Sequence, residues 1–195
     1  MTVIGVTGNF GTGKTFVASV FKSLGAKVLD ADRIAHNEMN RGTVAYRKIV
    51  KYFGRGILDE SGDIDRKKLG AAVFKNKKDL AKLNRIVHPQ VIAFIKEQIK
   101  KSKKNDIMVV DAPLLIEANI TGIIDHLVVV KCSRQIQISR CMEKFEIAKK
   151  DVLNRIRNQI PLKRKVELAD FVVDNDRSRA ETRRQVIEIW RKVWK

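Results

Sequence analysis

The sequence predicts a three-layer α/β fold with a five-stranded parallel sheet, a helical insertion and a helical lid. Short apolar runs alternate with amphipathic stretches along the chain, which is the pattern of a parallel sheet covered by helices. The first apolar run leads directly into a glycine-rich loop and a helix. A length of 195 residues suits one domain that carries insertions.

The five strands are short, dense and often β-branched, as expected of strands buried on both faces. We expect them at residues 3–7, 27–30, 107–111, 127–131 and 171–174. Helices are expected to open at Lys14, to cover 133–143 and to run over 179–194. The last helix has a start signal, because Glu181 follows Ser178 at the spacing of a capping box.

The gap between the second and third strands is too long for one crossover helix. Helical stretches are expected within it at 43–53, 67–75, 80–87 and 89–101, around a glycine-rich turn region at 54–65. The predicted domains are therefore a nucleotide-binding core (1–30, 105–143 and 169–195), a mostly helical substrate insertion (31–104) and a basic lid (144–168). The strings at 59–62 and 76–79 match GTPase motifs, but neither follows a buried strand, so a turn and a helix start are the better interpretation.

The composition is that of a globular chain, with 44% hydrophobic and 32% charged residues. No apolar run approaches the ~20 residues that a membrane helix needs, and no export leader is recognised, so a cytoplasmic protein with reduced cysteines is expected. The net charge of +18 admits a solvated basic surface, a polyanionic ligand or nucleic acid. Aromatic residues are few and are not interleaved with the basic ones, so nucleic acid is not expected.

The loop after the first strand matches the phosphate-binding motif G-x-x-x-x-G-K-[ST]. Its glycines let the backbone turn N–H groups toward a phosphate at the start of a helix. Lys14 is expected to bridge the β- and γ-phosphates of ATP, and the Thr15 hydroxyl to bind Mg²⁺. The predicted nucleotide-binding residues of this loop are Gly8, Asn9, Phe10, Gly11, Thr12, Gly13, Lys14 and Thr15.

Three carboxylates follow buried strands. Asp111 ends the third strand, where it would hold Mg²⁺ or merely cap the following turn. Asp30 and Asp32 follow the second strand, at the edge where open α/β sheets bind ligands. One of this pair would accept the proton of an attacking hydroxyl, although Asp32 also suits a helix N-cap.

The chain resembles dephospho-CoA kinase, a family that phosphorylates the ribose 3′-hydroxyl of dephospho-coenzyme A with ATP in the last step of coenzyme A synthesis. The resemblance covers about residues 3 to 175. It is carried by VTG at 6–8, LDAD at 29–32 with IA at 34–35, IDRKKL at 64–69 with VF at 73–74, IVHP at 86–89, DAPLLIE at 111–117, Gln159, and ADFVVDN at 169–175.

The resemblance implies roles for particular residues. Asp32 is the implied base, and the insertion is similar to the region that holds the coenzyme. Arg66 and His88 are implied substrate contacts, although an exposed arginine and a helix-entry histidine are the ordinary alternatives. Pro113 and Leu114, in the motif at 111–117, are further implied substrate contacts.

The lid side departs from the family pattern at one position. Arg140 matches the arginine that reaches the nucleotide and is predicted to be catalytic together with Lys14 and Asp32. Where a second arginine is common, this chain has Lys144, which keeps the charge without the planar, two-pronged geometry.

The leading hypothesis is thus an ATP- and Mg²⁺-dependent kinase of dephospho-coenzyme A, acting as a monomer or small homo-oligomer. A kinase of another small hydroxyl compound or of a nucleoside monophosphate shares every feature of the loop. A nucleic-acid-binding P-loop ATPase is the third alternative.

Overall fold

The computed structural model describes residues 1–74, 76–118 and 120–194. The chain divides into two compact units. Unit 1 contains Met1–Asp30 and Lys101–Lys195, and unit 2 contains Ala31–Lys100.

Unit 1 is built on a parallel five-stranded sheet in the order β2-β3-β1-β4-β5. The prediction of an α/β fold with this sheet is confirmed, and every predicted strand is found to within one residue. The strands are β1 (Thr2–Thr7), β2 (Lys27–Asp30), β3 (Ile107–Asp111), β4 (His126–Lys131) and β5 (Phe171–Asp174).

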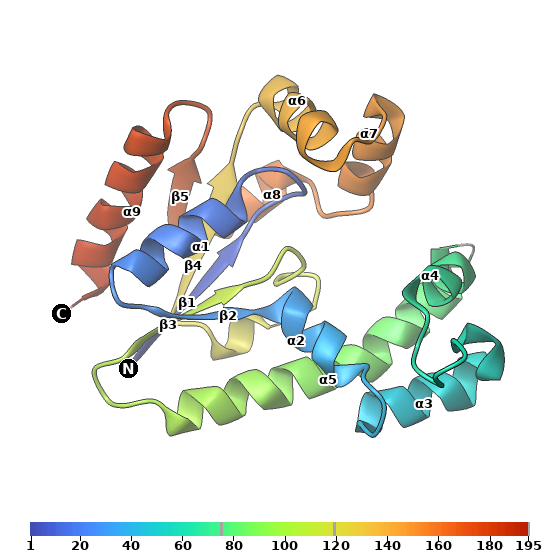
Figure 1. Ribbon diagram of the computed structural model, residues 1–195. Helices are drawn as coiled ribbons and strands as arrows, with labels where there is room; N and C mark the ends of the chain where they lie inside the picture. Colours follow the sequence, from blue (N-terminus) through green and yellow to red (C-terminus); the bar gives the residue numbers. More distant parts are fainter. Residues whose placement is uncertain (75, 119, 195) are drawn as a thin grey trace. The chain divides into compact units, whose positions relative to one another are not determined.

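One face of this sheet carries the main hydrophobic core of unit 1. Alternate side chains of the strands, among them Ile4, Val109 and Val128, pack with the buried faces of α1 (Lys14–Ser23) and α9 (Arg179–Val193). Figure 1 shows these two helices side by side along the sheet. Because α1 starts where the loop after β1 ends, this packing fixes the loop against the sheet.

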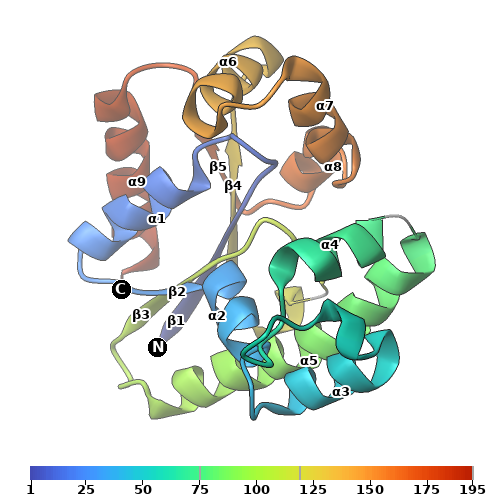
Figure 2. The same ribbon diagram turned by 45° about the vertical axis from the view of Figure 1, so that its right-hand side comes forward.

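Three helices lie between β4 and β5 in the sequence, and the first two lie beyond the carboxyl end of β4 (Figure 2). The first falls largely in the predicted core (105–143), and the other two in the predicted lid (144–168). The three helices are α6 (Arg134–Phe145), α7 (Lys149–Arg157) and α8 (Leu162–Glu167). The predicted helix at 133–143 is α6, which continues for two residues beyond its predicted end. A 3₁₀ turn, η2 (Thr121–Ile123), precedes β4.

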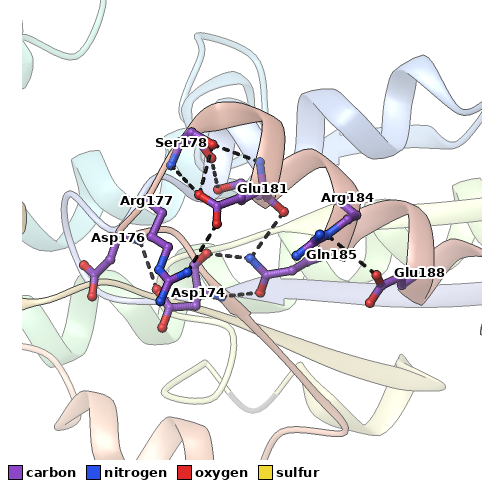
Figure 3. Close-up of polar contacts among 9 residues, drawn as sticks. Asp174, Asp176, Arg177, Ser178, Glu181, Arg184, Gln185 and Glu188 are labelled. Atoms are coloured by element: carbon purple, nitrogen blue, oxygen red, sulfur yellow. Dashed lines mark hydrogen bonds and ion pairs between the residues drawn. The ribbon is translucent and has the colours of Figure 1, made fainter.

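The start of α9 has the capping box that the sequence predicts (Figure 3). The Ser178 hydroxyl accepts a hydrogen bond from the Glu181 N–H, and the Ser178 N–H donates to the Glu181 carboxylate. Gln185 of the same helix exchanges two hydrogen bonds with the backbone of Asp174, at 2.8 and 2.9 Å. The helix is therefore joined to the end of β5.

Unit 2 is mostly helical, as expected of residues 31–100. Its elements are α2 (Ala31–Glu38), α3 (Val44–Phe53), the 3₁₀ turn η1 (Arg55–Ile57), α4 (Arg66–Phe74) and α5 (Lys77–Lys101). The two strings that match GTPase motifs are a turn around Asp59 and the start of α5 at Asn76. The Asp59 carboxylate accepts from the N–H groups of Ser61 and Asp63, and the Asn76 side chain accepts from Lys78.

The two helical stretches predicted at 80–87 and 89–101 form one helix instead, with Pro89 in its interior. A proline removes one backbone hydrogen bond, to the carbonyl four residues earlier. Pro89 and Arg85 are both exposed, so that carbonyl is close to water. Val87, Val91 and Ile95 are all buried, at i, i+4 and i+8. Their continuous apolar stripe outweighs the proline.

Among the residues that the structure describes, no helix combines the length and the apolar character that crossing a membrane requires.

Candidate functional site

The phosphate-binding loop connects β1 directly to α1, as the sequence predicts. Its turn is closed by Thr12, whose N–H and hydroxyl both donate to the carbonyl of Asn9, at 3.1 and 3.0 Å. Gly13, immediately before α1, has a left-handed φ of 92°. A β-carbon there would also collide with the Asn175 side chain, so only glycine fits. The loop therefore leads directly into the N-terminus of α1, where backbone N–H groups are available to bind a phosphate.

Asn175, immediately after β5, holds this loop in place. Its side-chain amide donates to the Thr12 carbonyl at 2.9 Å and accepts from the Thr182 hydroxyl at 2.9 Å. Its backbone N–H donates to the Lys131 carbonyl at the end of β4. Asn175 is buried, so these bonds are shielded from water. Four segments of unit 1 thus meet at one side chain and its peptide group.

Arg140 joins the same network. One of its guanidinium nitrogens donates to the Asn175 carbonyl at 2.8 Å, which holds the half-buried side chain of α6 beside the loop. Lys144, one turn later, is exposed, and its ammonium lies 5.3 Å from the ring centroid of Phe145. Arg140 is thus fixed by a hydrogen bond, whereas Lys144 is exposed to solvent and contacts only the Phe145 ring among the contacts described above. Their predicted roles toward the nucleotide stay predictions.

Two carboxylates lie next to each other at the carboxyl edge of the sheet. Asp111 ends β3 and is paired in register with Val6 of β1, and Asp30 ends β2 in register with Asp111. Thr15 is in the first turn of α1. Carboxylate and hydroxyl oxygens are the hard donors that Mg²⁺ prefers, and this ion usually takes its remaining ligands from phosphates and water. Asp111 and Thr15 therefore fit the predicted metal site.

No group of three or more histidine, cysteine, aspartate or glutamate side chains forms a metal-binding cluster within the described ranges. A magnesium ion held largely by phosphates does not need one.

The tip of the loop contacts the region predicted to be the lid. The Phe10 N–H donates to the Gln159 side chain at 2.7 Å, and the Phe10 carbonyl accepts from the Gln137 side chain. The Asn9 amide donates to the Ile160 carbonyl at 3.3 Å. The loop is thus hydrogen-bonded to α6 and to the segment that follows α7.

A buried ion pair fixes α8 to the segment after β3. The Lys165 ammonium is fully buried and lies 2.8 Å from a carboxylate oxygen of Glu117. It also donates to the Pro113 carbonyl at 2.8 Å. Glu117 accepts, in addition, from the Ile160 N–H at 3.2 Å. Pro113, a predicted substrate contact, therefore has its carbonyl turned toward Lys165, while Leu114 is half-buried in the same segment.

The two cysteines of unit 1 are both buried. Burial raises the pKa of Cys132 to about 11, and burial also raises the pKa of Cys141 above its ordinary value. Both thiols therefore stay protonated near neutral pH. The Cys141 sulfur occupies the space where a β-carbon of Gly11 would lie, so it acts as a packing partner of the loop.

Three predicted site residues lie in unit 2. Asp32 is exposed in the first turn of α2, and Arg66 is exposed at the start of α4. Arg66 lines a polar pocket of about 250 Å³ together with His36, Met39, Asn40, Asp63 and Ile64. A guanidinium in a small polar pocket suits a phosphate or another anionic group.

His88 is half-buried in the middle of α5, and burial lowers its pKa below the ordinary value of 6.5. Its imidazole is therefore neutral at pH 7 and suits a hydrogen bond better than an ion pair with a phosphate.

A family model described as dephospho-CoA kinase matches residues 2–181. The chain belongs to the dephospho-CoA kinase family. A dephospho-CoA kinase of Carboxydothermus hydrogenoformans is 42% identical over 197 residues, which cover 100% of this chain and 95% of the relative.

Solved structures agree with this family assignment. A dephospho-CoA kinase from Campylobacter jejuni superposes with a TM-score of 0.73 at 28% identity, covering 98% of this chain and 96% of that one. A protein from Thermus thermophilus superposes with a TM-score of 0.86 at 26% identity, covering 98% and 97%. The family resemblance drawn from the sequence is confirmed.

Sequence reasoning missed several residues that organise the site of this dephospho-CoA kinase family member. Glu117, Gln159 and Asn175 stand inside the motifs that carry the resemblance, so the signal was present, although no role was assigned to them. Gln137 and Lys165 had no such signal, because a glutamine on a helix and one more cation in a basic segment look ordinary. Only the three-dimensional contacts distinguish these two.

Proposed function

We propose that this chain transfers the γ-phosphoryl group of ATP to the ribose 3′-hydroxyl of dephospho-coenzyme A, giving coenzyme A and ADP. The observation that carries the proposal is the family match over residues 2–181, which includes the phosphate-binding loop and the motifs at 111–117 and 169–175. In the reaction, the bond from the γ-phosphorus to the bridging oxygen of ADP breaks, and a bond to the 3′-oxygen forms. The proton of the hydroxyl goes to a carboxylate.

On the donor side, backbone N–H groups of the loop and the Lys14 ammonium bind the β- and γ-phosphates. Arg140, anchored on the Asn175 carbonyl, adds positive charge where the phosphoryl oxygens become more negative in the transition state. Asp111 and Thr15 would hold Mg²⁺, which when bound would supply positive charge to offset that of the phosphates. Because Arg140 is held before ATP arrives, it needs to reorganise little during the reaction.

On the acceptor side, Asp32 is the proposed base for the 3′-hydroxyl. Arg66 and its pocket are proposed to bind an anionic group of the coenzyme, and neutral His88 to donate or accept a hydrogen bond. Pro113 and Leu114 are proposed to contact the substrate as well. Unit 2, with residues 101–104, would thus select the acceptor, and residues 144–168 would exclude water from the transferring phosphate.

The reaction is proposed to take place in the cytoplasm, where the two buried thiols would remain reduced. Dephospho-coenzyme A is the proposed small-molecule partner. No nucleic-acid partner is proposed, and a monomer or small homo-oligomer is the proposed assembly.

The test is a panel assay of ATP consumption with purified protein and Mg²⁺. Dephospho-coenzyme A, nucleoside monophosphates, other small hydroxyl compounds and nucleic acid are offered separately. ADP formation that depends on dephospho-coenzyme A alone supports the proposal. Activation by another hydroxyl compound, by a monophosphate or by nucleic acid would reject it in favour of the corresponding alternative.

Asp32→Asn tests the assignment of the base. The variant should bind ATP with nearly unchanged affinity in calorimetry but turn over at least about a hundredfold more slowly, as expected when a general base is lost. Turnover equal to that of the wild type would remove Asp32 from this role.

A further inference from the structure

Phe10 places a large aromatic ring at the tip of the phosphate-binding loop. Phosphate binding by such loops uses backbone N–H groups and the Lys14 ammonium, so the ring itself has no part in it. The ring packs instead against side chains of two helices. Phe10 is half-buried and packs against a small hydrophobic core of Cys141, Val152 and Ile156, which belong to α6 and α7. One residue of the loop is thus part of the small core that α6 and α7 form.

The ring makes two directional contacts with that region. It stacks on Phe145, the last residue of α6, with ring centroids 5.0 Å apart and an angle of 27° between the planes. The guanidinium carbon of Arg155, on α7, lies 5.1 Å from the centroid of the Phe10 ring. This is the distance of a cation–π contact.

Arg155 depends on this contact for its position. Its side chain is exposed, and across residues 1–74, 76–118 and 120–194 its guanidinium makes no hydrogen bond or ion pair. An exposed arginine without a polar anchor samples many rotamers. The ring of Phe10 therefore selects among them.

The backbone of Phe10 is fixed from two sides. Its N–H donates to Gln159, which follows α7, and its carbonyl accepts from Gln137 on α6. These bonds fix the backbone from which the ring projects. The position that it imposes on Arg155 is thereby tied to the backbone of the phosphate-binding loop.

The charge of Arg155 acts close to the loop. Burial raises the pKa of the Cys141 thiol, and Arg155, Lys14 and Lys144 each lower it, with Arg155 having the largest effect of the three. The Cys141 sulfur itself lies against Gly11 of the loop. The charges of Arg155 on α7 and Lys14 on α1 thus both reach the Cys141 thiol beside the loop.

We propose that Phe10 is a positioning residue that holds the Arg155 guanidinium beside the phosphate-binding loop, where Arg155 neutralises charge on the nucleotide phosphates. Arg155 then supplies the planar cation that Lys144 does not. The inference rests on the proposed kinase function. It adds to that function a contact between Phe10 of the loop and Arg155 of α7 that fixes the position of the Arg155 guanidinium.

The kinetic test separates the aromatic face of Phe10 from its volume. Phe10→Leu keeps an apolar side chain but removes the face, and should lower kcat/KM for ATP about fivefold, as expected for the loss of one cation–π contact. Phe10→Tyr keeps the face and should recover most of that loss. In an Arg155→Gln background, Phe10→Leu should add less than about a twofold further loss, because both changes remove the same interaction.

A second measurement does not depend on the enzyme activity of the protein. Amide hydrogen exchange is measured over α7 in the protein without added nucleotide. Phe10→Leu should speed exchange of residues 149–157 severalfold relative to the wild type and to Phe10→Tyr. Phe16→Leu is the matched control, because the Phe16 ring makes a similar contact, 5.5 Å from the guanidinium carbon of Arg179 at the start of α9. It should leave exchange in α7 unchanged.

The inference is overturned if Phe10→Leu matches the wild type in α7 exchange. It is also overturned if Phe10→Leu and Phe10→Tyr lose activity equally, or if the losses of Phe10→Leu and Arg155→Gln multiply. If the wild type fails to phosphorylate dephospho-coenzyme A, the proposed function fails, while the exchange comparison still decides the role of Phe10.

Discussion

The two units of this molecule are held by polar contacts of different range. In unit 1, the Asn175 side chain bonds to Thr12, 163 positions away in the sequence, and Gln137 bonds to Phe10, 127 positions away. In unit 2, the side chain that caps α3 acts locally, because Thr43 accepts from the N–H of Tyr46. The donor site thus depends on distant segments that the sheet brings together. The longer side-chain bonds of α3 still span far fewer positions, with 16 from Tyr46 to Gly62 and 27 from Tyr52 to Asp79.

The largest effect is expected from the buried ion pair of unit 1. Lys165→Met leaves Glu117 without its cation. It also removes one of the two donors to the Pro113 carbonyl, the other being the Thr7 hydroxyl at 3.3 Å. The variant should lose about 3–5 kcal/mol of unfolding free energy, measured by urea denaturation, because one partner of a buried pair remains uncompensated.

The control for this pair is the double variant Lys165→Met/Glu117→Gln, which removes both charges. It should be more stable than Lys165→Met alone. If the double variant is less stable than the single one, the pair does not hold α8 through its charge.

A smaller but still substantial effect is expected at Asn175. Asn175→Ala removes the side-chain donor of the Thr12 carbonyl and leaves the buried Thr182 hydroxyl only its longer bond, 3.3 Å, to the Ser178 carbonyl. A buried group left unsatisfied costs about 1–3 kcal/mol. Because Thr12 belongs to the phosphate-binding loop, ATP affinity measured by calorimetry should fall as well. A variant that unfolds more easily yet binds ATP like the wild type would show that Asn175 supports the fold without organising the loop.

The same contrast explains what the sequence predicted. The loop at residues 8–15, the five strands and the Ser178 capping box are local patterns, and all were found where they were expected. The contacts of Asn175, Gln137 and Lys165 join residues far apart in the sequence, and no local pattern announces them. The continuous α5 was missed because the rule for proline is local, whereas the buried stripe through Val91 that outweighs it extends over about two turns.

In unit 2, a single local cap should have a correspondingly modest effect. Thr43→Ala removes the hydroxyl that accepts from the Tyr46 N–H at 3.1 Å, which should cost about 1 kcal/mol in denaturant unfolding. Thr43→Ser keeps the hydroxyl and is the matched control. If Thr43→Ala lost as much unfolding free energy as Asn175→Ala, the two units would not differ in the way described.

The smallest expected effect is the pH dependence contributed by His88. Burial lowers its pKa in the folded protein below 6.5, so the unfolded chain binds a proton more readily. Stability should therefore fall as the pH drops below about 6.5, and level off below the folded-state pKa. In denaturation curves between pH 7 and pH 5, His88→Gln should fall less steeply than the wild type. Parallel curves would show that His88 does not titrate in this way.

The central claim is that the phosphoryl group of ATP reaches the ribose 3′-hydroxyl of dephospho-coenzyme A. Its most direct test is phosphorus NMR of the product formed from ATP, Mg²⁺ and dephospho-coenzyme A by the purified protein. We predict a new 3′-phosphomonoester signal that grows in equal amount with ADP. ADP accompanied only by inorganic phosphate, or a phosphate at another position of the acceptor, would contradict the account.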